Sequence, residues 1–164
     1  KWKNFKNLNK NSIGIELVNK GHRLGYQNFS KKQINSLVKL CLILKKKYQI
    51  KISNILGHSD IAPLRKLDPG EKFPWLRLSK SGLSFWYKKK QKKSFVFKVL
   101  KKSEIRKIFF ANLFKIGYRY FNKNKPNKTD KFIIRAFQMR FLQENVTGDI
   151  DQKTLTISHY LTNK

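Results

Sequence analysis

Residues Ser12 to Val18 read SIGIELV, a short run of apolar and β-branched side chains that is typical of a buried strand. Ser30 and Gln33 then form a capping-box pattern. Apolar residues recur at helical spacing from there to Tyr48, which predicts a surface helix of about 18 residues packed on a sheet. Gln49 to Leu56 reads as a turn and a second short strand. The order strand, helix, strand predicts an α/β fold with a mixed sheet flanked by helices.

Glu16 is the one charged residue inside the first apolar run. A carboxylate is costly to bury in a strand unless a positive charge, a metal ion or a proton accompanies it. Glu16 is therefore a candidate functional residue. The alternative is a position on a solvated face of the strand, which would need no partner.

The chain beyond the first domain has helical patterns only. Phe73 to Leu83 is predicted as a short aromatic helix that closes the first domain, and the charge run KKKQKK at Lys88 to Lys93 indicates a linker. We expect three amphipathic helices after it, over Ser103–Gly117, over Thr129–Glu144 with Thr129 as N-cap, and over Asp151–Leu161 with Asp151 as N-cap. The prediction is thus an α/β domain over residues 1–87, a basic linker over 88–101 and a small all-α three-helix module over 102–164.

The 164 residues carry a formal net charge of +29, from 38 Lys and Arg against 9 Asp and Glu. Such a surplus favours an anionic partner, for which nucleic acid, acidic lipid and bacterial wall polymers all qualify. Charge alone does not choose among them, nor between a dedicated groove and lysines spread over every solvated face. The single cysteine, Cys41, is predicted to be a core residue without a disulfide. No apolar run approaches the roughly 20 residues of a membrane span.

Gly57 to Gly70 reads GHSDIAPLRKLDPG, a loop composition that gathers His58, Asp60 and Asp68. A catalytic zinc ion takes three protein ligands from His and carboxylate side chains and leaves a fourth position for water. The loop is therefore a candidate zinc site. Spacing alone leaves open a structural alternative, in which His58 caps the loop or bonds to Asp60.

Three segments carry a resemblance to a known family. SIGIELVN at Ser12–Asn19, QI at Gln33 and Ile34, and above all GHSDIAPLRKLDPGEKFPW at Gly57–Trp75 resemble the type 2 N-acetylmuramoyl-L-alanine amidase family. The resemblance implies a zinc-dependent enzyme of the bacterial cell wall. Its reaction would be hydrolysis of the amide that joins the lactyl group of N-acetylmuramic acid to the L-alanine of the stem peptide.

The resemblance also implies roles for individual residues. His58 and Asp68 would be ligands of Zn²⁺, and Asp60 would brace the loop. Glu16 would act as general base on the zinc-bound water. Lys66 would place a positive donor where negative charge develops on the carbonyl oxygen. Arg65 is a candidate for binding a substrate carboxylate, with a solvated side chain as the alternative.

One ligand of the family has no counterpart in this sequence. The family's first zinc ligand is a His on an early strand that precedes the segment matched here, so the resemblance implies an amino-terminally truncated member whose early strands are missing. His22 resembles a family loop position outside the metal set, and His159 lies in the last predicted helix of the other module. Two ligands would hold zinc weakly, so a chain that began at Lys1 is expected to be a poor enzyme. The alternative is a catalytically inactive remnant or a wall-binding protein.

The last part of the chain has a resemblance of its own. IRAFQMRFL at Ile134–Leu142 and GDIDQKT at Gly148–Thr154 are similar to a three-helix peptidoglycan-binding module. The implied partners are peptidoglycan or muropeptides, bound by a monomer that recognises no specific nucleic acid. The implied location is the cell envelope, in the periplasm or associated with the outer membrane, rather than the cytoplasm. Nucleic-acid binding driven by charge alone is a third hypothesis, which steep salt dependence would support.

Overall fold

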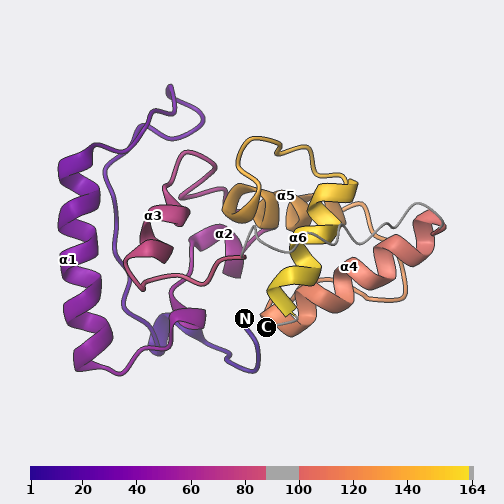
Figure 1. Ribbon diagram of the computed structural model, residues 1–164, viewed down its shortest axis with the longest axis horizontal. Coiled ribbons are helices and arrows are strands. Elements are labelled where there is room, and N and C mark those ends of the chain that lie inside the picture. Colours follow the sequence, from indigo (N-terminus) through magenta and orange to yellow (C-terminus); the bar gives the residue numbers. More distant parts are fainter. Residues whose placement is uncertain (88–99, 163–164) are drawn as a thin grey trace.

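The computed structural model describes residues 1–87 and 100–162, and its regular elements within those ranges are helices (Figure 1). The helix α1 lies at one end of the molecule and α4 at the other, with α2 and α3 between them. In chain order the helices are α1 (Lys31–Lys47), α2 (His58–Ile61), α3 (Trp75–Lys80), α4 (Lys102–Ile116), α5 (Asp130–Phe141) and α6 (Gln152–Thr162), with 3-10 turns at Leu8–Lys10 and Ile52–Asn54.

The predicted α/β fold is wrong. Residues 1–87 and 100–162 contain no strand, and their only β pairing is an isolated bridge between Trp2 and Phe5. The Ser12–Val18 segment has no regular structure, and Val18 is 91% exposed. The second predicted strand contains the 3-10 turn Ile52–Asn54 instead. A strand is stabilised by the ladder that it forms with a neighbour, and within the described ranges no segment pairs with either run, so their strand-like composition does not produce a sheet.

The first predicted helix is present as α1, and its start shows how the irregular segment is held. Ser30 is the N-cap, and its hydroxyl accepts a 3.2 Å hydrogen bond from the Gln33 amide. In a full capping box the Gln33 side chain would return to the Ser30 amide. It donates instead to the carbonyl oxygen of Val18, at 3.0 Å. Gln33 therefore ties the Ser12–Val18 segment to the start of α1.

The inner face of α1 packs against α3 and the loop before it. The buried side chains of this small core are Ile34, Leu37, Phe73, Trp75, Leu78 and Leu83, and Leu17 packs on it from the irregular segment. The aromatic helix predicted over Phe73–Leu83 is real but shorter, since α3 covers Trp75–Lys80. Cys41 lies at the edge of this core and is half-buried.

The three helices predicted for the second half are observed as α4, α5 and α6, with ends within three residues of the predicted ones. Asp151 caps α6 as predicted, because its carboxylate accepts a 2.7 Å hydrogen bond from the Thr154 amide. Thr129 precedes α5, but its hydroxyl donates to Asn127 rather than capping the helix. These helices bury a core rich in phenylalanine, including Phe109, Phe110, Phe137 and Phe141.

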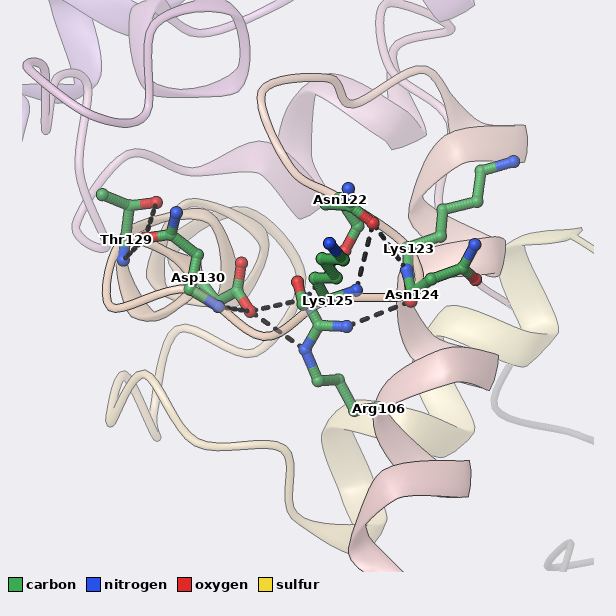
Figure 2. Close-up of polar contacts among 8 residues, drawn as sticks. Arg106, Asn122, Lys123, Asn124, Lys125, Thr129 and Asp130 are labelled. Carbon is green, nitrogen blue, oxygen red and sulfur yellow. Dashed lines mark hydrogen bonds and ion pairs between the residues drawn. The ribbon is translucent and has the colours of Figure 1, made fainter.

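The connection between α4 and α5 is held by one arginine (Figure 2). Arg106 on α4 donates to the Asp130 carboxylate at 3.0 and 2.6 Å. Its remaining donors reach the carbonyl oxygens of Asn122, Lys123 and Lys125 at 2.8 to 3.0 Å. Arg106 and Asp130 are mostly buried, so this ion pair fixes the loop to both helices.

The two halves of the chain share one hydrophobic core. Trp2 and Phe85 are buried in the same cluster as the side chains of α4, α5 and α6. The predicted linker 88–101 falls mostly on residues 88–99, which lie outside the described ranges, and the division into domains stays a prediction. No described helix is long and apolar enough to cross a bilayer.

Candidate functional site

The GHSDIAPLRKLDPG segment folds into a loop whose two ends are tied together. Its first residues form α2, and the Ser59 amide donates a 2.8 Å hydrogen bond to the carbonyl oxygen of Asp68. Gly57 packs so closely on Pro69 that a β-carbon there would lie 2.6 Å from the proline Cδ. The Asp68–Pro69 peptide bond is cis. This packing brings the side chains of His58 and Asp68 to the same point of the loop.

His58 and Asp68 face one another across this loop. His58 Nδ1 lies 3.0 Å from Asp68 Oδ2, and the two side chains are 34% and 57% exposed. Two ligands that each bind a tetrahedral zinc ion at about 2.1 Å are separated by roughly 3.4 Å. The observed separation is close to that value, so an imidazole nitrogen and a carboxylate oxygen can share one cation after a small side-chain adjustment. The pair therefore fits two of the ligands of a zinc site.

The other predicted site residues do not join this pair. Glu16 is exposed on the irregular segment, which matches the solvated alternative rather than the buried strand, because no sheet covers it. Lys66 is half-buried and Arg65 is exposed. Within residues 1–87 and 100–162, no hydrogen bond or ion pair connects these three side chains to His58 or Asp68, and no cluster holds three metal-ligating side chains.

Asp60 braces the loop, as predicted, but with partners that the sequence did not suggest. It is 2% exposed, and its Oδ2 accepts a 2.8 Å hydrogen bond from the Gly57 amide. The same oxygen accepts from Arg140 Nη1, and Oδ1 accepts from the Tyr118 hydroxyl. His58 bonds to Asp68, so the alternative of a His58–Asp60 contact is not observed. The only sequence signal for Arg140 is a lone arginine within the apolar run AFQMRFL.

Arg140 is almost fully buried and donates hydrogen bonds from both terminal nitrogens of its guanidinium, Nη1 and Nη2. Besides Asp60, it donates from Nη2 to the carbonyl oxygen of Ile55 and to the Ser84 hydroxyl, both at 3.0 Å. The guanidinium carbon lies 4.1 Å from the centre of the Trp75 ring and 4.8 Å from that of Phe85. Stacking on these rings adds a cation–π attraction to the hydrogen bonds.

The Tyr118 hydroxyl is held in its neutral, donating form. Burial raises the pKa of Tyr118 well above its ordinary value, and the adjacent Asp60 carboxylate raises it further. Tyr118 therefore donates to Asp60 throughout the physiological pH range.

A second aromatic side chain supports the other end of the loop. The Tyr26 hydroxyl donates to the carbonyl oxygen of Pro69 at 2.6 Å and accepts from the Lys72 amide at 2.9 Å. Burial raises the pKa of Tyr26 to about 12. Gly70 packs against this tyrosine with a φ of +77°, and a β-carbon there would lie 2.6 Å from the hydroxyl, so a side chain at this position would displace Tyr26. His22 stacks on Tyr26 and lies 3.0 Å from Glu71.

An open groove of about 550 Å³ lies next to His58. Its lining comes from the segment Ile61–Arg65, from Lys1 and Asn7–Lys10 near the start of the chain, and from Tyr120 in the helical half. Arg65 therefore lines the same groove as His58. The positive charges of Lys1, Lys10 and Arg65 favour an anionic group in this groove.

Comparison of sequences relates the chain to enzymes of known name. Residues 1–71 match the Amidase_2 family, described as N-acetylmuramoyl-L-alanine amidase. Over 171 aligned residues the chain is 33% identical to N-acetylmuramoyl-L-alanine amidase AmiD of Escherichia coli K12. This alignment covers 99% of this chain and 61% of AmiD. Over 67 residues it is 42% identical to 1,6-anhydro-N-acetylmuramyl-L-alanine amidase AmpD of Haemophilus influenzae. This shorter alignment covers 40% of this chain and 34% of AmpD.

Solved structures give the same relationship. AmpDh3 from Pseudomonas aeruginosa superimposes with a TM-score of 0.84 at 31% identity, over 98% of this chain and 65% of that protein. AmiD from E. coli, in complex with the substrate anhydro-N-acetylmuramic acid-L-Ala-D-gamma-Glu-L-Lys, superimposes with a TM-score of 0.80 at 31% identity, over 98% of this chain and 64% of AmiD. The chain thus spans just under two thirds of the length of these relatives.

Proposed function

We infer that the chain belongs to the Amidase_2 family, and we propose that the complete protein is an N-acetylmuramoyl-L-alanine amidase. The bond cleaved would be the amide between N-acetylmuramic acid and the L-alanine of the stem peptide, in peptidoglycan or its fragments. The observation that carries the proposal is the His58–Asp68 pair at 3.0 Å, within the most specific motif of the sequence. Support also comes from the substrate bound to AmiD, a muropeptide with this bond.

Zinc is the cofactor of the proposed reaction, and His58 and Asp68 are the residues that would hold it. When bound, zinc supplies a Lewis acid and a water molecule whose pKa is lowered to about 7. The tie between the Ser59 amide and Asp68 keeps the two ligands at the same end of the loop. Because a catalytic zinc usually has three protein ligands, we propose that a further ligand completes the site in the complete protein.

The remaining catalytic roles are proposed for Glu16 and Lys66. Glu16 would take the proton of the attacking water and return it to the leaving amine. The backbone just after Glu16 is held, because Leu17 packs on the core of α1 and α3 and Val18 accepts a hydrogen bond from Gln33. Lys66 would donate to the carbonyl oxygen as negative charge develops on it. Arg65, in the groove beside His58, would bind a carboxylate of the stem peptide.

Three further properties belong to this proposal. The helices α4 to α6 would bind peptidoglycan, which the resemblance of Ile134–Leu142 to a wall-binding module supports. The protein would act as a monomer in the cell envelope. Its positive charge would favour association with the anionic wall rather than with a specific nucleic acid.

A second candidate function is wall binding without catalysis. It is favoured by one observation, since the described residues bring only two metal-ligating side chains together at the loop. A protein of this kind would be retained by insoluble peptidoglycan but would contain no stoichiometric zinc after purification. The amidase proposal expects both retention and zinc.

The test is hydrolysis of a defined muropeptide by the complete protein in the presence of zinc. Release of the stem peptide, followed by mass spectrometry, is the expected result. His58→Ala and Glu16→Ala should each abolish release, whereas His22→Ala should retain it, because His22 pairs with Glu71 outside the proposed metal site. Full activity in both the His58 and the Glu16 variants would contradict the assignment.

A further inference from the structure

We propose that Arg140 and Tyr118, which belong to the helical half of the chain, position His58 for its metal ion. The helices α4 and α5 would then be a structural part of the active site, in addition to any part that they play in wall binding. The metal-binding aspect of this inference rests on the proposed function, whereas the anchoring of the loop does not.

Asp60 connects Arg140 and Tyr118 to the helix that carries His58. His58 and Asp60 both lie in α2, which has only four residues and is too short to be stable alone. Asp60 holds the start of this helix by accepting a hydrogen bond from the Gly57 amide. Its other contacts come from Arg140 and Tyr118, so the orientation of α2 is set by groups that follow it in the sequence by 80 and 58 residues.

Arg140 also holds the chain just before the site. Its second donor group reaches the carbonyl oxygen of Ile55, three residues before His58. The rings of Trp75 and Phe85 stack on the guanidinium and limit its movement. One arginine side chain therefore fixes the backbone at Ile55 and the helix that carries His58.

The second proposed ligand depends on the same anchor. The Ser59 amide donates to the carbonyl oxygen of Asp68, so the position of Asp68 follows that of α2. A shift of α2 would therefore displace both His58 Nδ1 and Asp68 Oδ2 from the rest of the site, and metal sites tolerate only small errors in ligand geometry. Arg140 and Tyr118 are thus positioning residues, since neither contacts the proposed metal site directly.

The burial of the Arg140–Asp60 pair supports a role in orientation. Their side chains are 1% and 2% exposed. A buried ion pair is a weak source of stability, because desolvation offsets most of the attraction, but its hydrogen bonds fix the direction of both partners. The chain offers a matched comparison in Arg106–Asp130, a second mostly buried pair whose two residues both belong to the helical half (Figure 2).

The test uses three variants of the full chain, Tyr118→Phe, Arg140→Met and the control Arg106→Met. Hydrogen–deuterium exchange followed by mass spectrometry reports on residues 55–70, and a competing chromophoric chelator reports the zinc dissociation constant. Tyr118→Phe removes one hydrogen bond but keeps the ring, so it should stay folded even if Arg140→Met does not. We expect it to accelerate exchange in residues 55–70 relative to α6 and to weaken zinc binding about tenfold, the usual loss for a group that supports a ligand.

The control separates anchoring from general destabilisation. Arg106→Met should lower the melting temperature without accelerating exchange in residues 55–70 relative to α6, and folded protein should bind zinc as before. Equal effects of Tyr118→Phe and Arg106→Met on exchange in residues 55–70 would overturn the inference. If the complete protein without substitutions binds no zinc, the proposed function fails, and the exchange measurement alone then decides whether Arg140 and Tyr118 anchor the loop.

Discussion

The backbone amide of Lys3 donates a 2.9 Å hydrogen bond to the carbonyl oxygen of Gly117, the residue that follows α4. Beside this bond the Trp2 side chain is 1% exposed, and its indole nitrogen donates to the carbonyl oxygen of Ser53 at 3.1 Å. The Trp2 ring meets the edge of Tyr118 at 5.0 Å. Trp2 therefore joins the first residues, the turn at Ser53 and the end of α4 into one core.

Gly117→Ala should destabilise the protein by about 2 to 6 kcal/mol, because a strained backbone and an overpacked core each cost roughly 1 to 3 kcal/mol. Gly117 has a φ of +142°, and a β-carbon there would lie 2.5 Å from Trp2 Cε2. Urea unfolding measures the change. The control is Gly14→Ala, where nothing lies within 4 Å and the effect should stay within about 0.5 kcal/mol. Equal destabilisation by the two substitutions would contradict the contact between Trp2 and Gly117.

Arg140→Met should cost about 3 to 5 kcal/mol, because it leaves the Asp60 carboxylate buried without its cation. Asp60→Asn removes the charge from the other side of the same pair, so the double variant should be destabilised by clearly less than the sum of the single ones. A double-mutant cycle of urea unfolding gives the coupling. Additive effects would mean that the two side chains do not interact in solution.

Local patterns in the sequence were sufficient to predict where the longer helices lie. The N-cap at Ser30, the apolar spacing of α1 and the Asp151 cap of α6 depend on residues a few positions apart, and all three are observed. The His58–Asp68 pair was also within reach of sequence reasoning, because both residues lie in one loop held by its own backbone hydrogen bond.

Features that depend on distant partners were not predictable in this way. A run such as Ser12–Val18 has the composition of a strand, but composition does not reveal whether a neighbouring strand lies beside it. The exposure of Glu16 follows from the lack of such a neighbour among the described residues. Likewise, nothing near Asp60 in the sequence points to Arg140, which is 80 residues away.

Cys41 should react slowly with a disulfide reagent at pH 8, because burial raises the pKa of its thiol and the thiolate is the nucleophile. Because folding favours the neutral thiol, the buried Cys41 thiol contributes to the stability of the folded chain at low pH. This contribution is fully present below the pKa of the thiol in the unfolded chain, about 8.5, and is lost as the pH rises through the higher pKa of the folded chain. Reaction with Ellman's reagent before and after addition of urea measures the difference, and Cys41→Ala serves as the blank. Equal rates in the two states would show that the thiol is fully accessible in the folded chain.

Two histidine–carboxylate pairs of the same length are seen among residues 1–87, and zinc should distinguish them. His58 lies 3.0 Å from Asp68, and His22 lies 3.0 Å from Glu71. Zinc that binds only the folded protein raises its stability by about 2.7 kcal/mol at a hundredfold excess over the dissociation constant. We expect a zinc-dependent rise in the melting temperature that disappears in His58→Ala and persists in His22→Ala. Loss of the rise in His22→Ala alone would move the metal site to Glu71, at the surface beside Tyr26, and would remove the physical basis for placing the reaction at His58.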